Sequence, residues 1–411
     1  MKQLHRRVVV TGLGILSPIG NTVSEAWSSC TEGISGITSV DVGISNSPVS
    51  IGAQLKNFNT SDYLDPKEVR RIDPFIQYGL IAANQSIADS GILDLPSLNK
   101  EKVGVNFGAG IGGIQTIENN KVILESKGHK KVSPFFVPGS IVNMISGLVS
   151  IKHGFMGPNT SVVTACSTGN HCIGTAARSI ACGEADVMIA GGAEMASTPL
   201  SISGFISARA LSTNSDPELA CRPWDKDRDG FILADGAGSL VLEDYEHAKQ
   251  RNAHIYAEII GFGMSSDAYH MTAPPEDGRG AALSMKNALI DAELNHEEID
   301  YINAHGTSTP LGDLAETRAL KTIFTNSMPS ISSTKSMTGH TLGAAGAIES
   351  IFCIKSLNDN VVPPTINLIN QDPECDLDYT PLKSIDKKVS VAMNNSFGFG
   401  GTNSTLVFKK I

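Results

Sequence analysis

The sequence predicts an α/β fold made of two related halves, in which helices cover both faces of a sheet. Short β-branched apolar runs alternate with longer segments of helical periodicity along most of the 411 residues. The succession of helix, strand, glycine turn and small-residue helix occurs twice, which indicates two related units rather than a solenoid. The predicted halves are residues 1–254 and 255–411. The regular alternation also predicts a mainly parallel sheet.

The first half begins with a strand over residues 7–11, which Gly12 and Gly14 turn. A short helix covers 23–33, and the segment that follows it up to residue 62 looks irregular. Apolar residues at helical spacing predict one helix over 66–91, with Gly91 as its stop. The remaining predicted elements of this half are a strand at 103–107, helices at 114–125 and 140–152, and strands at 186–190 and 239–243.

The second half repeats this order. Residues 257–262 begin a strand, and a helix over 279–292 leads to a strand at 301–303. A strand at 330–333 then leads into a helix of small residues. The last predicted elements are that helix, at 343–357, and a closing hairpin of 389–394 with 405–409.

The segment 161–177 contains the strongest candidate for chemistry, because Cys166 lies in the turn between a predicted strand at 161–163 and a helix of small residues. Unpaired backbone amides and the positive end of the helix dipole favour a thiolate at such a position. This geometry suits a buried nucleophile that reacts with a thioester or an ester. The alternative is an inert core cysteine, since free cysteine is among the most buried residue types.

Two other motifs resemble ligand-binding loops but lack an essential partner. Residues 108–113 match G-x-G-x-x-G after a strand, yet 130–134, about 20 residues further on, do not form a strand that ends in an acidic residue. Residues 225–230 open like an EF-hand loop, but the twelfth position is Gly236 and not glutamate. We therefore expect neither a dinucleotide site nor a calcium site, and a hydrogen-bonded turn at 225–230.

Three later glycine-rich segments carry polar chemistry. Residues 303–313 contain His305, residues 333–340 contain His340, and residues 394–403 surround Phe399. One histidine at a strand end is more often structural. Two histidines in such surroundings, together with a cysteine in a turn, favour catalysis.

The Cys166 segment and these three glycine-rich segments together resemble the β-ketoacyl-acyl-carrier-protein synthases of the thiolase superfamily. They most closely resemble the elongating type, synthase II. The resemblance extends from residues 8–14 to Phe408, and the order Cys166-Ser167-Thr168 is its one departure in the nucleophile segment. It implies a thiolase-like fold with two pseudo-duplicated α/β halves in αβαβα layers. It also implies a decarboxylating Claisen condensation that elongates fatty acids. Further matching stretches are 222–225, 229–231, 235–238 and 265–271.

The resemblance gives roles to the candidate residues. Cys166 accepts an acyl group, and His305 and His340 donate hydrogen bonds to the enolate that forms when malonyl loses CO2. Each well-aimed donor contributes roughly 3 kcal/mol to such a transition state. The backbone amides of Cys166 and Phe399 hold the tetrahedral oxyanion, and Phe399 gates the acyl pocket against the loop around Asp267. His171 and Cys172 receive no family role.

Other residues match supporting positions of the family. Lys335 and Glu316 match a buried ion pair, Phe231 packs beside the leaving carboxylate, and Ile111 lines the acyl tunnel across a dimer interface. The residues expected to bind substrate are Ile111, Phe231, Thr307, Thr309 and Gly400. No cofactor is implied beyond a structural monovalent cation, Na⁺ or K⁺, at Asn303, Glu349, Asn394 and Asn395.

The composition indicates which classes of binding partner to expect. A net charge of −10 argues against nucleic acid, while the resemblance implies an acidic acyl carrier protein and a homodimer. Seven cysteines without regular spacing predict reduced thiols and a cytoplasmic protein, and no apolar run approaches the length of a membrane span. A local basic patch must then dock the carrier, with candidates Lys67, Arg70, Arg71, Lys130, Lys131 and Arg209.

Three related functions remain as alternatives. A polyketide ketosynthase shares the condensing chemistry. A thiolase joins coenzyme A thioesters without decarboxylation, but thiolases use a second cysteine as base, which the His305 and His340 pair argues against. A polyketide chain-length factor lacks the nucleophile, and the presence of Cys166 argues against it.

Overall fold

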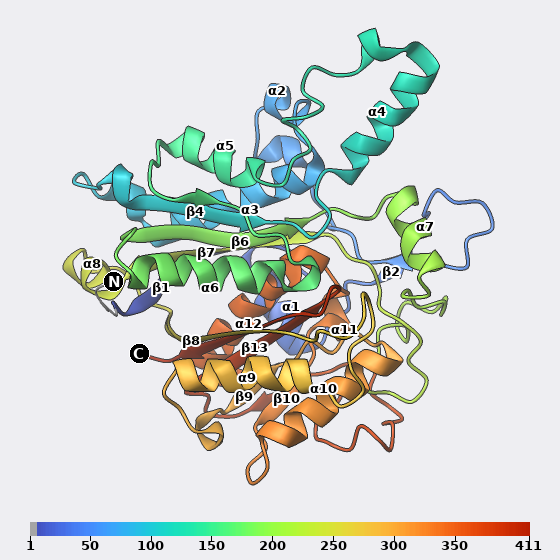
Figure 1. Cartoon of the computed structure of the whole chain (residues 1–411), viewed down its shortest axis with the longest axis vertical. Coiled ribbons are helices and arrows are strands. Elements are labelled where there is room, and N and C mark those ends of the chain that lie inside the picture. Colours follow the sequence, from blue (N-terminus) through green and yellow to red (C-terminus); the bar gives the residue numbers. More distant parts are fainter. Residues whose placement is uncertain (1–5) are drawn as a thin grey trace.

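The computed structural model describes residues 6–411 and shows five layers of alternating helix and sheet (Figure 1). Helices α3 (Pro74–Ser90) and α5 (Met144–His153) cover one outer face. Helices α9 (Arg279–Asp291) and α10 (Pro310–Ile323) cover the other. Between the sheet layers, α6 (Thr168–Ala181) packs against α12 (Ala345–Asp359). This is the αβαβα arrangement that the sequence predicts.

The two sheet layers belong to one hydrogen-bonded sheet of ten strands, joined where β1 pairs with β8. The strand order is β10-β9-β13-β14-β8-β1-β7-β6-β4-β5. In chain order the strands are β1 (Val8–Leu16), β4 (Val103–Gly108), β5 (Asn159–Thr160), β6 (Val187–Glu194), β7 (Gly236–Asp244), β8 (Ala257–Ser266), β9 (Tyr301–Asn303), β10 (Ser330–Ser332), β13 (Val391–Gly398) and β14 (Thr402–Lys409).

The order repeats from the junction outward. The run β1-β7-β6-β4-β5 corresponds to β8-β14-β13-β9-β10, and each corresponding pair of neighbours has the same relative direction. The expectation of a mainly parallel sheet is wrong, because five of the nine neighbouring pairs are antiparallel. A parallel connection needs a long crossover, whereas the short turn from β13 to β14 permits only antiparallel pairing.

The predicted helix over 66–91 is in fact two helices, α2 (Pro66–Val69) and α3. Proline disfavours helical geometry in the residue before it, and Asp73 is extended with ψ 150°. The Asp73 carboxylate accepts the Phe75 amide and caps α3. The other elements are α1 (Val23–Glu32), β2 (Thr38–Ser39), β3 (Ile51–Gly52), α4 (Ile114–Lys127), α7 (Pro199–Ser207), α8 (Tyr245–Gln250), α11 (Lys335–Thr338), β11 (Val361–Val362) and β12 (Ile385–Asp386).

Small residues let the central layer pack tightly, and this brings the two halves together. A Cβ added at Gly169 of α6 would lie 2.6 Å from the Ala347 nitrogen of α12. A Cβ at Gly346 of α12 would lie 2.6 Å from the Asn170 side-chain oxygen. Only glycine permits so close a helix contact, which places the N-terminal turns of α6 and α12 next to each other.

Across residues 6–411, none of the helices has both the length and the apolar character that a bilayer crossing requires.

Candidate active site

Cys166 lies in a single 3₁₀ turn, Ala165–Ser167, that leads directly into α6. Ala165 has the left-handed φ of 49°, which aims the turn away from the preceding chain. The Ser167 hydroxyl fixes the turn to the second half by hydrogen bonds to the carbonyls of Ser396 (2.9 Å) and Thr402 (2.7 Å). The predicted position at a helix start is confirmed. The predicted strand at 161–163 is not, because pairing ends with β5 at Thr160.

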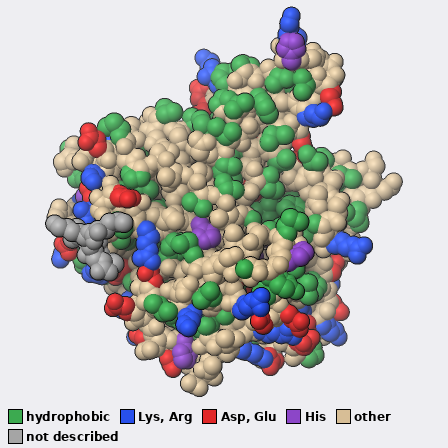
Figure 2. All heavy atoms as spheres, in the orientation of Figure 1, with side chains coloured by type: hydrophobic (Ala, Val, Ile, Leu, Met, Phe, Trp, Pro, Cys, Tyr) green, Lys and Arg blue, Asp and Glu red, His purple; other side chains and the backbone are tan. Residues whose placement is uncertain are grey.

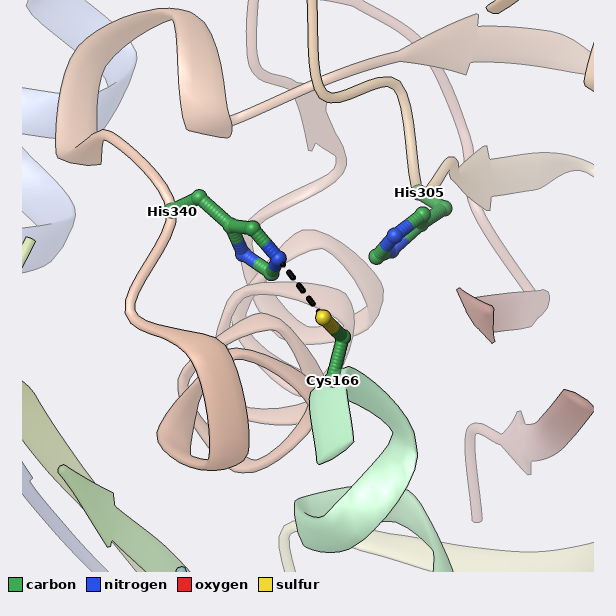
Figure 3. Close-up of side chains that lie close together, drawn as sticks. All are labelled: Cys166, His305 and His340. Carbon is green, nitrogen blue, oxygen red and sulfur yellow. Dashed lines mark hydrogen bonds between the residues drawn. The ribbon is translucent and has the colours of Figure 1, made fainter. Parts of the chain in front are cut away.

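Three side chains converge at this turn, as Figure 3 shows. The Cys166 Sγ lies 3.0 Å from the His340 Nε2. The rings of His305 and His340 are 5.4 Å apart and nearly perpendicular, and one atom from each of the three residues lies within 4.8 Å of the others. His305 follows β9 and His340 follows α11, so a sulfur from the first half meets two imidazoles from the second.

The three residues open into one cavity of about 320 Å³. Four of the five residues expected to bind substrate line it, namely Ile111, Phe231, Thr307 and Thr309, and so does Phe399. The fifth, Gly400, is not among its lining residues. The Gly400 amide donates instead to the Met271 carbonyl (2.8 Å), which ties the Phe399 segment to the loop that begins at Asp267.

Burial dominates the state of the nucleophile. Desolvation raises the pKa of the Cys166 thiol to about 12, although the Lys335 charge and the backbone amides of Phe399 and Cys166 act to lower it. The thiolate expected from the helix start is therefore not the resting form. Local dipole effects are outweighed by the loss of water around the sulfur.

Both imidazoles are neutral at pH 7. Burial, and then the nearby Lys335 charge, hold the pKa of His305 and of His340 well below the usual range. The edge of Phe231 supports the His340 ring at a centroid distance of 5.2 Å. Neutral rings can donate hydrogen bonds to a developing oxyanion without carrying a charge of their own. Among the described residues, the Nδ1 atoms of His305 and His340 have no hydrogen-bond partner.

Comparison with known proteins agrees with this geometry. The model of the beta-ketoacyl synthase N-terminal domain matches residues 5–248, and that of the C-terminal domain matches residues 256–369. The chain belongs to the β-ketoacyl synthase family. It is 53% identical over 410 residues to the 3-oxoacyl-[acyl-carrier-protein] synthase 2 of Coxiella burnetii, covering 99% of both chains. Members of this family are condensing enzymes of the acyltransferase class, and so is this chain.

Solved structures of related synthases have the same fold. A β-ketoacyl synthase from Burkholderia phymatum superposes with a TM-score of 0.92 at 36% identity, covering 99% of this chain and all of that one. A type II polyketide ketosynthase, solved with its acyl-carrier protein and bound to the hexaketide, superposes with a TM-score of 0.91. It is 34% identical, with 99% of both chains covered.

The ion pair in this synthase differs from the predicted one. Lys335 pairs with Glu349 of α12, and both side chains are buried. Glu316 of α10 instead accepts the backbone amides of His305 (2.9 Å) and Gly306 (2.7 Å). The predicted partner was wrong because α12, and not α10, brings its carboxylate to the ammonium group. Glu316 therefore positions the His305 loop.

The four residues expected to hold a monovalent cation are all buried. Glu349 is engaged by Lys335, the Asn303 amide donates to Thr334 (3.2 Å), and Asn395 accepts from Thr405 (2.9 Å). The Asn394 side-chain nitrogen lies 3.0 Å from the Asn170 oxygen. Each residue thus has a protein partner, but the Asn394 Oδ1 and Glu349 Oε2 atoms are buried without one, and the cation stays a prediction.

The two loop motifs serve internal contacts. Asp225 accepts the backbone amide of Asp227 (3.0 Å) through its side chain and that of Arg228 (3.2 Å) through its carbonyl, as expected for a hydrogen-bonded turn. Its other carboxylate oxygen accepts the amides of Ile369 (3.1 Å) and Asn370 (2.7 Å). The loop 108–113 wraps around the carboxylate of Glu194, which the sequence analysis missed. The only signal was an acidic residue at the end of a buried strand. His171, which had no assigned role, contacts the Thr164 hydroxyl through Nδ1 (2.7 Å).

The six residues of the expected docking patch are all exposed. Lys67 belongs to α2, and the Arg71 guanidinium stacks 4.8 Å above the Phe135 ring. Basic side chains also gather at the tip of the protrusion that α4 forms at the top of Figures 1 and 2, where Lys130 and Lys131 follow the helix.

Proposed function

We propose that this synthase elongates fatty acids by joining an acyl-carrier-protein thioester to malonyl-carrier protein, with loss of CO2, to give 3-oxoacyl-carrier protein. One observation carries the proposal: the Cys166 sulfur and two neutral imidazoles face the same apolar cavity. The name of the Coxiella relative, 3-oxoacyl-[acyl-carrier-protein] synthase 2, supports the same reaction.

In the first step, the Cys166 sulfur attacks the acyl thioester. The thiol loses its proton as the new C–S bond forms, and the departing carrier thiolate takes up a proton. The amides of Cys166 and Phe399, which point at the sulfur in the resting enzyme, are suitably placed to stabilise the negative oxygen of the tetrahedral intermediate. The acyl chain then occupies the part of the cavity that Ile111 lines.

In the second step, malonyl-carrier protein loses CO2 and the electron pair of the broken C–C bond forms an enolate. His305 and His340 donate hydrogen bonds to the enolate oxygen, so no strong base is needed. The enolate carbon attacks the acyl-Cys166 carbonyl. A C–C bond forms and the C–S bond breaks. The sulfur leaves as a thiolate and takes up a proton from water, which restores the resting thiol.

The alternatives fit less well. A polyketide ketosynthase would use the same residues, but the solved example is 34% identical, whereas the fatty-acid relative is 53% identical. A thiolase needs a second cysteine as base, and among the described residues that line the cavity Cys166 is the one cysteine.

The proposal includes a carrier-protein partner, a second copy of the chain and a cytoplasmic location. The solved ketosynthase complex with an acyl-carrier protein supports the first. For the second, the edge strand β5 and the neighbouring exposed side chains of Val163 and Ile111 form a surface that a second copy would cover. All seven cysteines are free, which suits a reducing compartment.

Mass spectrometry tests the reaction. Acyl-carrier proteins of graded chain length should leave an acyl adduct on Cys166, and added malonyl-carrier protein should then release CO2 and 3-oxoacyl product. Condensation of coenzyme A thioesters without release of CO2 would point to a thiolase instead. Absence of any adduct on Cys166 would overturn the proposal.

Charge reversal tests the docking patch. Replacing Lys67, Arg70 and Arg71 by Glu should raise the KM for the carrier substrate about tenfold at low ionic strength, and less in high salt, because exposed charges are screened. The matched control reverses three exposed lysines that do not line the cavity, Lys383, Lys388 and Lys410. An unchanged KM at low ionic strength would mean that these three residues do not bind the carrier protein.

A further inference from the structure

The carboxylate of Glu194 has an unusual set of partners. It is fully buried at the end of β6 and accepts four hydrogen bonds, all from backbone amides. The Oε1 atom accepts from Ile111 (3.0 Å) and Gly112 (3.1 Å). The Oε2 atom accepts from Gly110 (2.5 Å) and Gly343 (3.1 Å). The glycine-rich loop that would surround a phosphate in a nucleotide-binding protein thus surrounds a side chain of its own protein.

The four donors come from two segments, one from each half of the chain, that are in direct contact: a Cβ added at Gly343 would lie 2.3 Å from the Gly110 nitrogen. Gly110 and Ile111 line the active-site cavity from the first half. Gly343 belongs to the turn before α12 in the second half, and its neighbour Leu342 lines the cavity beside His340. One carboxylate therefore holds together a segment from each half, and Ile111 of one segment and Leu342 of the other line the cavity.

We propose that Glu194 is a positioning residue that holds the loop of Ile111 against the turn of Gly343, and that by fixing Ile111 in the cavity it sets the length of acyl chain that the cavity accepts. The inference rests on the proposed function, because it concerns the acyl group carried by Cys166. Glu194 does not line the cavity and acts through the position of Ile111.

The chemistry of the contact explains why a carboxylate is required. Four N–H donors need an acceptor with several lone pairs and a negative charge, which only an ionised carboxylate offers. In Glu194→Gln the side chain keeps its shape, but its NH2 group faces two amides that are themselves donors. Those two amides lose their acceptor, and the loop of Gly110 to Gly112, which is rich in glycine, becomes free to move.

The test measures chain-length selectivity. Single-turnover acylation of Cys166 is followed by mass spectrometry with short, medium and long acyl-carrier proteins, for the wild-type chain and for Glu194→Gln. We expect the ratio of long-chain to short-chain acylation rates to change about tenfold in the variant. Glu194→Asp, which keeps the charge but withdraws it from the loop, should change the ratio in the same direction by less.

Asp235→Asn is the matched control. Asp235 is also a buried carboxylate and accepts the backbone amides of Ala196 (3.0 Å) and Ser197 (3.2 Å), but neither it nor its donors line the cavity. Its loss should lower stability and leave the selectivity ratio unchanged. A change of equal size in Asp235→Asn would mean that general loosening, and not Glu194, alters the ratio.

A double variant tests the route of action. In the Ile111→Ala background, Glu194→Gln should change the ratio no further if Glu194 acts through Ile111. The inference is overturned if Glu194→Gln, or Glu194→Asp should the first variant fail to fold, lowers all acylation rates equally. Absence of acylation in the wild-type chain would instead refute the proposed function, so the two failures are distinguishable.

Discussion

The turn that holds Cys166 and the turn that holds Gly343 occupy equivalent places in the two halves. Each is a 3₁₀ turn that leads into a central helix, and each contains a non-glycine residue of left-handed φ, 49° at Ala165 and 47° at Leu342. They differ in what faces them. The Cys166 turn faces the cavity, whereas the Gly343 amide faces the Glu194 carboxylate.

This difference shows how one backbone device serves two purposes. In the first half, the turn presents a reactive side chain and leaves space in front of it for substrate. In the second half, the turn donates the Gly343 amide to a buried acid, which holds this turn against the loop of Gly110. The chemistry of the site is therefore asymmetric although the fold around it is repeated.

The largest test of this contrast removes the reactive side chain. Cys166→Ala should lower the condensation rate by at least about 10⁴-fold, since no other nucleophile is available for acyl transfer. Thermal unfolding should change little, because alanine fits the same turn. Condensation at the wild-type rate would show that the first turn is not the reactive one.

The second test concerns the ion pair beside the second turn. Lys335→Met should lower the free energy of unfolding by about 4 kcal/mol, because it leaves Glu349 buried without its partner. Urea unfolding of Lys335→Met with Glu349→Leu should recover most of that loss. If Glu316→Leu recovered the lost stability and Glu349→Leu did not, Lys335 would pair with Glu316, as the sequence predicts.

The third test changes the second turn itself. A Cβ at Gly343 would lie 2.3 Å from the Gly110 nitrogen and 2.9 Å from the Glu194 Oε2. Gly343→Ala should therefore lower the free energy of unfolding by about 2 kcal/mol, the usual cost of overpacking. Gly204→Ala is the control, because an added Cβ there meets nothing within 4 Å. Equal free energies of unfolding of the two variants in urea would mean that Gly343 is not tightly packed against Gly110 and Glu194.

The smallest expected effect is a dependence of stability on pH. The pKa of His305 and of His340 is lowered in the folded chain, so the unfolded chain binds more protons near pH 6.5. The contribution of these two histidines to the free energy of unfolding should then decrease as the pH falls below about 6.5. Urea unfolding across this pH range checks the prediction. His305→Gln should reduce the slope of the free energy of unfolding against pH, and His270→Asn, which changes an exposed histidine, is the control. An unchanged slope in His305→Gln would mean that the imidazole is not buried neutral.

Much of the site could be predicted from sequence because its residues follow strands or turns with their own local patterns. Cys166, His305 and His340 each lie in a glycine-rich segment, and the succession of helices and strands around these segments occurs in both halves of the chain. The partner of Lys335 could not be predicted, since Glu316 and Glu349 both lie on helices and only the packing of α12 decides between them. The thiol form of Cys166 depends on burial by the whole fold, which a local pattern does not contain.

The fold was predicted less evenly. The predicted helices at 23–33, 114–125 and 279–292 agree closely with α1, α4 and α9, and the strand at Tyr301–Asn303 has the predicted bounds. The closing hairpin of β13 with β14 was predicted. The other antiparallel pairs were missed, because alternating strands and helices suggest crossovers and do not reveal which distant strands pair. The helix α10 was also missed, although Thr309 and Pro310 begin it with a proline at its first turn.

The place of β14 has a consequence for synthesis of the chain on the ribosome. This strand, Thr402–Lys409, is translated after every other described strand, yet it lies between β8 and β13. The sheet of the second half therefore closes only when these residues leave the exit tunnel, and Ser167 then gains its contact with Thr402. A nascent chain cannot hold a finished nucleophile turn, so activity arises only after translation has passed β14.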